Sequence, residues 1–314
     1  MKEISIIGCG LVGASWSLVF ARAGYNVKLY DPSPASTDAA LRFARTSAEV
    51  LATQELLNGQ TVAAVFRRLV PVRTLAEAVS VADYIQESVP ERLSIKQALY
   101  RQLASLVKAD AIIASSTSGL PASSFTSDIS GRERCIVAHP INPPHLIPLV
   151  ELVPAPWTAA DVIARTEALM KQVGQSPIRL NREIPGFVAN RLQSAVLGEA
   201  FRLVEDGVCS AADVDAAMSE GLGLRWSFMG PFETIDLNAQ GGIVDYCDKL
   251  GPMYFGLAKE QADPRLWNKG LVAAVETQRR QMTGQDQLDA RKAWRDRCLA
   301  RLIKAKRMVL REET

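Results

Sequence analysis

The sequence predicts an α/β fold in which a doubly wound parallel sheet is followed by a smaller all-helical domain. Short β-branched runs alternate with helix-like segments through the first half of the chain, which is typical of a parallel sheet. Beyond residue 183 the chain stays helical in character. A length of 314 residues suits two domains, so we expect a boundary near residue 183, with the sheet in 1–183 and the helices in 184–314.

Composition excludes several classes of protein. A net charge of +2 with 22% charged residues gives no field suited to nucleic acid or an anionic membrane. No charged leader precedes a long apolar segment, and no apolar run approaches the length of a membrane span. The five cysteines are scattered without metal-ligand spacing, so we expect reduced thiols, a cytoplasmic protein and no metal.

A glycine-rich turn between the first strand and the first helix predicts a dinucleotide site. The β-branched run at 4–7 ends there, and a helix-like segment follows from 14 to 23. The turn has the pattern G-x-G-x-x-G, formed by Gly8, Cys9, Gly10, Leu11, Val12 and Gly13. The first glycine permits the tight turn, the second admits the pyrophosphate, and the third allows close helix packing. The phosphates then bind the unpaired N–H groups at the helix N-terminus.

The second strand predicts which nucleotide binds. The run at 25–30 ends in Asp31, whose carboxylate falls where a ribose diol is held and would repel a 2′-phosphate. No arginine follows in 32–34, so the sequence favours NAD(H) over NADP(H) on a Rossmann-type domain. A glycine turn without a nucleotide, or a flavin site, is the alternative on the loop pattern alone.

Polar residues follow three further predicted strands, at 82–87, 111–115 and 136–138, with a helix expected around 94–106. Ligand chemistry in parallel sheets gathers at the carboxyl ends of strands. The polar residues that come just past these ends are Glu87, Glu91, Lys96, the run 115–118 and His139. A serine and threonine cluster is often only a turn or a helix cap, but its place beside the histidine strand favours a role for Ser118.

His139 and Glu151 have the layout of an acid/base dyad. His139 ends one buried apolar run, Glu151 lies inside the next, and the proline-rich loop between them can double the chain back. A buried carboxylate costs several kcal/mol unless it is paired, and His139 is the nearest candidate partner. The alternative interpretation is that His139 is a structural histidine whose hydrogen bonds are satisfied within the core.

A long amphipathic helix begins the second domain. Pro185 and Gly186 precede apolar residues at helical spacing over 187–204, and Asn190 lies in the first turns. Its amide could point toward the nucleotide domain, or it could be a solvated polar position. The basic stretch at 288–311 is balanced by acids, which favours a solvated or dimer-packing helix over a nucleic-acid arm.

These motifs together resemble the 3-hydroxyacyl-CoA dehydrogenase family. The resemblance rests on Gly8-x-Gly10-x-x-Gly13, Ser-Ser-Thr-Ser-Gly-Leu at 115–120, His139-Pro-x-Asn142-Pro, Val150-Glu151, Pro185-Gly186-Phe187-Val188-x-Asn190-Arg191 and Met229-Gly230-Pro231-Phe232-Glu233. Within the family the chain is similar to the branch of L-gulonate 3-dehydrogenase and lambda-crystallin. That similarity rests on the stretches 139–144, 147–154 and 221–231.

The resemblance implies roles for particular residues. It makes His139 the catalytic base and acid, with Glu151 as its partner, and it makes Ser118 and Asn190 ligands of the substrate oxygen. It implies cofactor contacts for Asp31, Glu91 and Lys96, and a homodimer formed through the helical domain. The reaction it implies is the NAD-dependent oxidation of a secondary alcohol.

Arg225 bears on the substrate. A forked cation suits a free carboxylate, which favours a small polar 3-hydroxy acid such as L-gulonate over a thioester. A surface salt bridge is the alternative for Arg225. The alternative substrates are an (S)-3-hydroxyacyl-CoA and L-carnitine, whose trimethylammonium would need an aromatic site. An NADH-binding structural or sensor protein is the alternative of another class.

Overall fold

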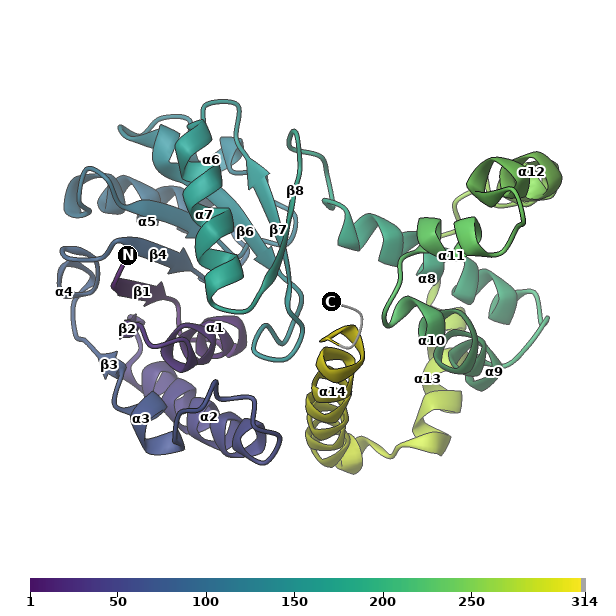
Figure 1. The fold of residues 1–314 in the computed structure, drawn as a ribbon, viewed down its shortest axis with the longest axis horizontal. Helices are drawn as coiled ribbons and strands as arrows, with labels where there is room; N and C mark the ends of the chain where they lie inside the picture. The colour runs from purple at the N-terminus through teal and green to yellow at the C-terminus, as the bar shows by residue number, and fades with distance from the viewer. Residues whose placement is uncertain (312–314) are drawn as a thin grey trace. The chain divides into compact units, whose positions relative to one another are not determined.

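The computed structural model describes residues 1–311 and divides them into two compact units (Figure 1). The first unit comprises Met1–Asn190 together with Leu299–Lys304, and the second comprises Arg191–Cys298 with residues 305–311. The sequence predicts a domain boundary near residue 183 but not the return of 299–304 to the first unit. Within that unit Ala300 is fully buried and Lys304 pairs with Glu55 at 2.7 Å.

The first unit is built on an eight-stranded sheet with the order β3-β2-β1-β4-β5-β6-β7-β8. This doubly wound order confirms the predicted fold class. The strands are β1 (Glu3–Ile7), β2 (Asn26–Tyr30), β3 (Leu69–Pro71), β4 (Tyr84–Glu87), β5 (Ile112–Ser115), β6 (Cys135–Pro140), β7 (Leu149–Pro154) and β8 (Ser176–Arg179).

One pair of strands departs from the predicted parallel arrangement. Strands β6 and β7 are antiparallel, whereas every other neighbouring pair is parallel. The connection between them is too short for the crossover that a parallel pair requires. It therefore returns the chain directly alongside β6.

Helices cover both faces of the sheet because alternate strand residues point to opposite sides. Ile112 and Ala114 join a core with α1, α2 and α7, whereas Ile113 joins a second core with α4, α5 and α6. The helices of this unit are α1 (Leu11–Arg22), α2 (Pro34–Ala52), α3 (Val62–Phe66), α4 (Leu75–Val79), α5 (Leu93–Leu106), α6 (Ser123–Thr126) and α7 (Ala160–Gln172), with a short 3₁₀ turn at Arg132–Arg134.

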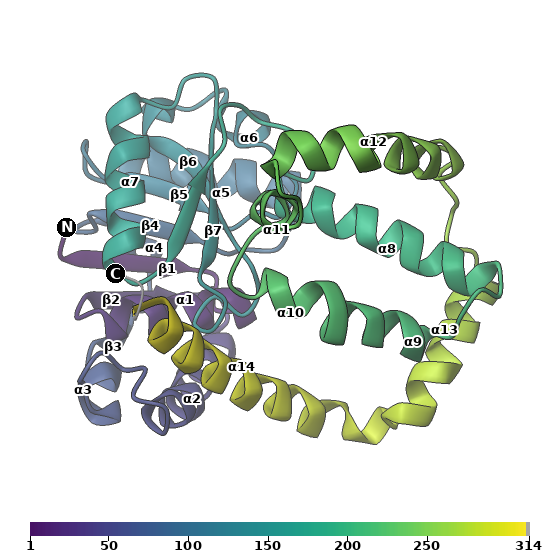
Figure 2. The ribbon, with the colours of Figure 1, turned by 45° about the vertical axis from the view of Figure 1, so that its right-hand side comes forward.

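The second unit is helical, as the sequence predicts (Figure 2). A hydrogen bond from the N–H of Ala211 to Gln278 Oε1 joins α9 to α13, and Phe201 of α8 stacks on Trp267. Its elements are α8 (Ala189–Glu205), α9 (Ala211–Ala216), a π-helical turn (Ala217–Leu222), α10 (Gly223–Trp226), α11 (Pro231–Leu237), α12 (Gly242–Glu260), α13 (Lys269–Met282), a 3₁₀ turn (Gln285–Gln287) and α14 (Leu288–Arg311), whose segment 299–304 belongs to the first unit. Across residues 1–311, no helix is long and apolar enough to cross a membrane.

Candidate active site

The turn between β1 and α1 has the shape that a pyrophosphate needs. Gly8 has φ +91°, and a Cβ there would lie 2.6 Å from the carbonyl oxygen of Ser88. A Cβ on Gly13 would lie 1.9 Å from the carbonyl oxygen of Gly8. At Gly10, in contrast, a Cβ would meet nothing within 4 Å, and no side chain caps the helix that follows. The first N–H groups of α1 are therefore open to an anion, which fits the pyrophosphate of NAD.

Asp31 lies against this turn. Its Oδ2 accepts a hydrogen bond from the backbone N–H of Cys9 at 2.9 Å, and its Oδ1 accepts one from Ser33 at 2.9 Å. These bonds fix the carboxylate at the end of β2, where an adenosine ribose would bind. Burial raises the pKa of the Cys9 thiol to about 11, so this cysteine stays protonated and is not a nucleophile at neutral pH.

Lys96 is buried in an ionic cluster beneath the strand ends. Its side chain is 1% exposed, and Nζ lies 2.8 and 2.9 Å from the two carboxylate oxygens of Glu87, which is fully buried. Ser115 completes the cluster by donating to Glu87 at 2.6 Å. Lys96 therefore neutralises a buried carboxylate, and its contact with the cofactor stays a prediction. The sequence does not reveal this pairing, because α5 presents Lys96 as an ordinary polar position.

Glu91 holds the turn that carries Ser118. Its Oε1 accepts hydrogen bonds from the hydroxyl of Thr117 and from the N–H groups of Ser118 (3.0 Å) and Gly119 (3.2 Å). Burial alone would raise the pKa of Glu91, but the Thr117 hydroxyl, the charge of Lys96 and the backbone N–H groups outweigh it and lower that pKa. The ionised carboxylate thus fixes the backbone on which Ser118 is exposed.

His139 and Glu151 lie directly opposite each other on β6 and β7. His139 Nδ1 is 2.6 Å from Glu151 Oε2, and the two side chains are 5% and 0% exposed. The other carboxylate oxygen accepts hydrogen bonds from the backbone N–H groups of Val188 (2.7 Å) and Ala189 (3.0 Å). Burial raises the pKa of Glu151, yet these hydrogen bonds outweigh burial and hold it below its ordinary value. Glu151 is therefore an anion that orients the imidazole.

Phe187 is part of this site, and sequence reasoning from spacing assigns it no role. Its fully buried ring lies 5.4 Å from the imidazole of His139, centroid to centroid. Its backbone has φ +51°, which is uncommon for an aromatic residue. This conformation precedes the two N–H groups that bind Glu151. The Pro-Gly-Phe sequence is the signal that marks the bend.

Asn190 reaches the Ser118 turn from the start of α8. Its Nδ2 donates to the carbonyl oxygen of Ser118 at 2.9 Å, and both residues belong to the first unit. Because β5 and β6 are parallel neighbours, the Ser118 turn and His139 lie at the same edge of the sheet. The first unit therefore brings all four predicted catalytic residues to one edge of the sheet, where β5 and β6 end and the antiparallel β7 begins.

Comparisons with known proteins identify the family. Residues 3–184 match the model of the 3-hydroxyacyl-CoA dehydrogenase NAD-binding domain, and residues 186–285 match that of the 3-hydroxyacyl-CoA dehydrogenase C-terminal domain. The chain belongs to the 3-hydroxyacyl-CoA dehydrogenase family. It is accordingly an NAD-dependent dehydrogenase, as the motifs predict.

Relatives of this dehydrogenase have different names and activities. Lambda-crystallin of Oryctolagus cuniculus is 42% identical over 98% of this chain and 97% of its own length. L-carnitine dehydrogenase of Streptomyces griseus is 40% identical over 80% of this chain and 74% of its own length. Among solved structures, an NAD⁺-dependent 5-formyl-3-hydroxy-2-methylpyridine 4-carboxylic acid 5-dehydrogenase has a TM-score of 0.79 at 30% identity, covering 98% and 99% of the two chains.

Arg225 of this dehydrogenase lies on α10 in the second unit and is exposed. Within residues 1–311 no carboxylate forms an ion pair with it, which does not favour the salt-bridge interpretation. On α12 the hydroxyl of Tyr246 lies 2.8 Å from that of Tyr254, and this hydrogen bond raises the pKa of Tyr246, while the charge of Arg225 opposes the rise. A substrate contact for Arg225 stays a prediction.

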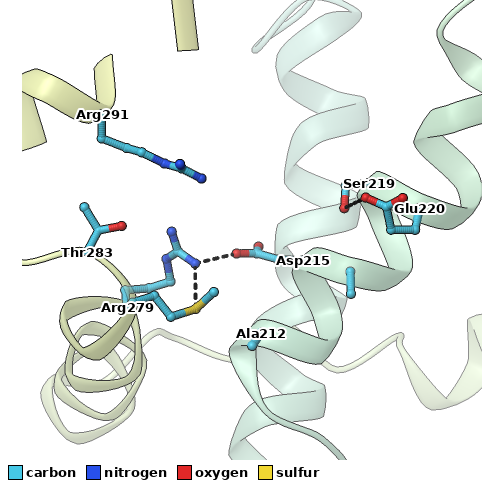
Figure 3. Close-up of a pocket in the computed structure, with 9 residues that line it drawn as sticks. Ala212, Asp215, Ser219, Glu220, Arg279, Thr283 and Arg291 are labelled. Atoms are coloured by element: carbon cyan, nitrogen blue, oxygen red, sulfur yellow. Dashed lines mark hydrogen bonds and ion pairs between the residues drawn. The ribbon is translucent and has the colours of Figure 1, made fainter. Parts of the chain in front are cut away.

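A hollow of about 360 Å³ in the second unit contains none of the predicted site residues. It lies between α9, the π-helical turn, α13 and the start of α14 (Figure 3). Arg279 crosses it to pair with Asp215 at 2.9 Å. Within the described part of the chain, no group of three or more His, Cys, Asp or Glu side chains could hold a metal ion.

Proposed function

We propose that this dehydrogenase oxidises the 3-hydroxyl of a small polar 3-hydroxy acid, of the L-gulonate type, to the 3-keto acid. The observation that carries the proposal is the 2.6 Å contact between His139 Nδ1 and the buried carboxylate of Glu151. NAD, when bound, supplies the acceptor for the hydrogen of the carbinol carbon. The residues of this chain handle the hydroxyl proton and position the oxygen.

His139 takes the proton through its second ring nitrogen. Because an anionic Glu151 accepts at Nδ1, the proton of the neutral imidazole resides there and Nε2 carries a lone pair. Nε2 therefore acts as the general base toward the substrate hydroxyl. Glu151 stabilises the imidazolium that forms, and in the reverse direction the same imidazolium is the acid.

Ser118 and Asn190 orient the substrate oxygen. The Ser118 hydroxyl forms no hydrogen bond with any described residue, so it is available to a ligand. Asn190 uses one amide hydrogen on the carbonyl of Ser118 and has a second to donate. Donors aimed at an oxygen that becomes a carbonyl lower the barrier in both directions.

A carboxylate on the substrate would bind Arg225. Its exposed guanidinium pairs with no described acid, and a planar fork matches a carboxylate better than a thioester. The similarity to L-carnitine dehydrogenases supports a second candidate, because L-carnitine is also a 3-hydroxy acid with a free carboxylate. A third candidate is an (S)-3-hydroxyacyl-CoA, since a 3-hydroxyacyl-CoA dehydrogenase of Gibberella moniliformis is 34% identical.

The second unit would be completed by a second copy of this chain. Neither α8, with 17 residues, nor α12, with 19, buries a single residue in the isolated chain. Exposed apolar patches of this extent mark interfaces, and two-fold homodimers are the commonest assembly. The exposed side chains that support this include Leu192, Phe232, Leu237, Val244, Phe255 and Trp267. A dimer has twice the 34.2 kDa mass of the chain, which sedimentation equilibrium measures.

We also propose a cytoplasmic location, because all five cysteines are free thiols. An NADH-binding structural or sensor protein remains the competing function of another class. It would bind NADH through the turn at Gly8 and oxidise none of the candidate acids.

The experiment that tests the function is the appearance of NADH with a panel of alcohols. The panel is L-gulonate, short 3-hydroxy acids, L-carnitine and 3-hydroxybutyryl-CoA, each with NAD and with NADP. Turnover of the free acids with NAD supports the proposal, whereas preference for the thioester contradicts it. His139→Ala should lower kcat by roughly 10²-fold or more, the usual size of a general-base contribution. NADH binding without any turnover would support the structural or sensor function.

A further inference from the structure

Two serine hydroxyls that the proposed chemistry does not use meet at the carboxyl edge of the sheet. Ser88 follows β4 and Ser116 follows β5, and their Oγ atoms are 2.9 Å apart. The N–H of Ser88 donates to Ile7 at 2.7 Å, and the N–H of Ser116 donates to Glu87 at 2.8 Å. Both residues are half-buried, so this serine pair is fixed to the sheet and still reaches solvent.

Gln86 determines the direction of the hydrogen bonds behind the serine pair. Its amide is fully buried, and Nε2 lies 2.7 Å from Ser116 Oγ and 3.3 Å from the carbonyl oxygen of Ala138. A carbonyl only accepts, so the amide atom facing Ala138 has to be the nitrogen. The amide oxygen then accepts from the hydroxyl of Tyr84 at 2.7 Å. Ser116 Oγ is therefore an acceptor toward Gln86.

One hydroxyl hydrogen of the serine pair remains without an acceptor. The pair has two such hydrogens, and the bond between Ser88 and Ser116 uses one. Neither hydroxyl has another partner besides Gln86 among residues 1–311. Because both serines are half-buried, solvent reaches this O–H, and a ligand oxygen can take the place of water there. The remaining O–H is therefore available to donate to a ligand.

The donor lies where a cofactor and a substrate would meet. The carbonyl of Ser88 is the group that a Cβ on Gly8 would approach to 2.6 Å, so the pair adjoins the nucleotide turn. On the other side, Gln86 binds Ala138, the residue before His139. The serine pair therefore sits between the nucleotide turn and the strand of the proposed base.

We propose that the serine pair is a binding subsite that donates one hydrogen bond to a neutral oxygen of the bound ligand. That oxygen belongs either to the nicotinamide carboxamide or to a further hydroxyl of a polyhydroxylated substrate. The assignment of these ligands rests on the proposed function. The subsite itself rests on the orientation of Gln86 and the hydrogen left over at the pair.

Ser116→Ala and, independently, Ser88→Ala test the subsite. The measurements are the NADH dissociation constant from cofactor fluorescence, and kcat/KM for L-gulonate and for (S)-3-hydroxybutyrate, which lacks further hydroxyls. Loss of one neutral hydrogen bond predicts a change of roughly 2- to 10-fold. Ser116→Thr keeps the hydroxyl and should restore the wild-type values. The matched control is Thr166→Val on α7, which removes a buried hydroxyl that donates to Val162 at 2.7 Å, away from the strand ends.

The two sources of the oxygen give different results. Weaker NADH binding in the alanine variants assigns the donor to the carboxamide, whereas a selective loss of kcat/KM for L-gulonate assigns it to a substrate hydroxyl. The proposal is overturned when NADH affinity and substrate preference match those of Thr166→Val, or when both acids lose activity equally with NADH affinity unchanged. Should no acid be oxidised, the proposed function fails, and the NADH titration alone still decides whether the pair binds the cofactor.

Discussion

Replacement of Glu151 by glutamine should remove most of the activity while it preserves the size of the side chain. Glu151 accepts hydrogen bonds at both oxygens, one from His139 and two from the backbone of Val188 and Ala189. Glutamine has one acceptor oxygen and one donor nitrogen. It cannot serve both sets of donors, so Glu151→Gln has to lose one of them.

Each orientation of the new amide has a separate consequence. When its nitrogen faces His139, Nδ1 must become the acceptor, the ring proton moves to Nε2, and the base toward the substrate is lost. When its nitrogen faces Val188 and Ala189, the amide N–H groups face two backbone N–H groups, and none of these donors has an acceptor in this fully buried place. The first orientation removes the base, and the second leaves only a neutral acceptor for the imidazolium that forms, so kcat falls in both. The second orientation also lowers the free energy of unfolding.

The sizes of both effects follow from the contacts. Loss of a correctly protonated general base lowers kcat by roughly 10²- to 10⁴-fold. Three charge-assisted hydrogen bonds become neutral or unmade, which lowers the free energy of unfolding by about 2–4 kcal/mol. For a chain of 314 residues that corresponds to a fall in melting temperature of roughly 3–6 °C.

The assay combines kcat at saturating NAD and substrate with thermal unfolding of the same samples. Glu167→Gln is the matched control, because Glu167 binds Lys171 at 2.6 Å on the surface of α7, and it should keep the wild-type kcat. A Glu151→Gln enzyme within a few-fold of the wild-type kcat over the whole pH range would refute the reasoning. It would mean that the orientation of His139 does not depend on this carboxylate.

Three further predictions concern other carboxylates. Asp31→Ser should raise kcat/KM with NADP and lower it with NAD by roughly tenfold, since it removes both the ribose acceptor and the charge that repels a 2′-phosphate; steady-state kinetics with each cofactor checks this. Glu91→Gln should lower kcat more than it raises the KM for NAD, because the Ser118 turn loses its anion; equal effects on both would contradict the role of Glu91 in holding that turn. Asp83 concerns stability: partial burial raises its pKa, but Lys108 and two backbone N–H groups outweigh burial and lower it to about 2 from 3.8. A carboxyl with a depressed pKa stabilises the fold above its unfolded pKa, so Asp83→Asn should lower stability by about 1–2 kcal/mol at neutral pH. That difference should vanish as the pH falls from about 4 toward 2 in urea unfolding, and a difference that persists at pH 2 would contradict the assignment.

The sequence predicts the sheet, the nucleotide turn and the helical second domain because each depends on local patterns. Alternating strands and helices, and glycines at fixed spacing, have few structural solutions. The buried stripe of α5 shows where such patterns fail. The helical spacing of apolar residues over 94–106 favours Ile95, Leu99, Leu103 and Leu106 as the buried stripe, yet the buried positions are Lys96, Leu99, Tyr100 and Leu103. Lys96 is buried because it pairs with Glu87 on the neighbouring strand. The spacing of apolar residues along a helix cannot predict a partner on another element.

The site itself depends on the one antiparallel pair in the sheet. In an antiparallel pair, residues directly opposite each other have adjacent side chains. Glu151 of β7 is the direct partner of His139 on β6, so their side chains meet. A parallel β7 would need a long crossover and would present its own carboxyl end, not its middle, near His139. The same reversal brings Glu151 within reach of the N–H groups that open α8. A single topological exception therefore creates the dyad and ties it to the residues that lead into the helical domain.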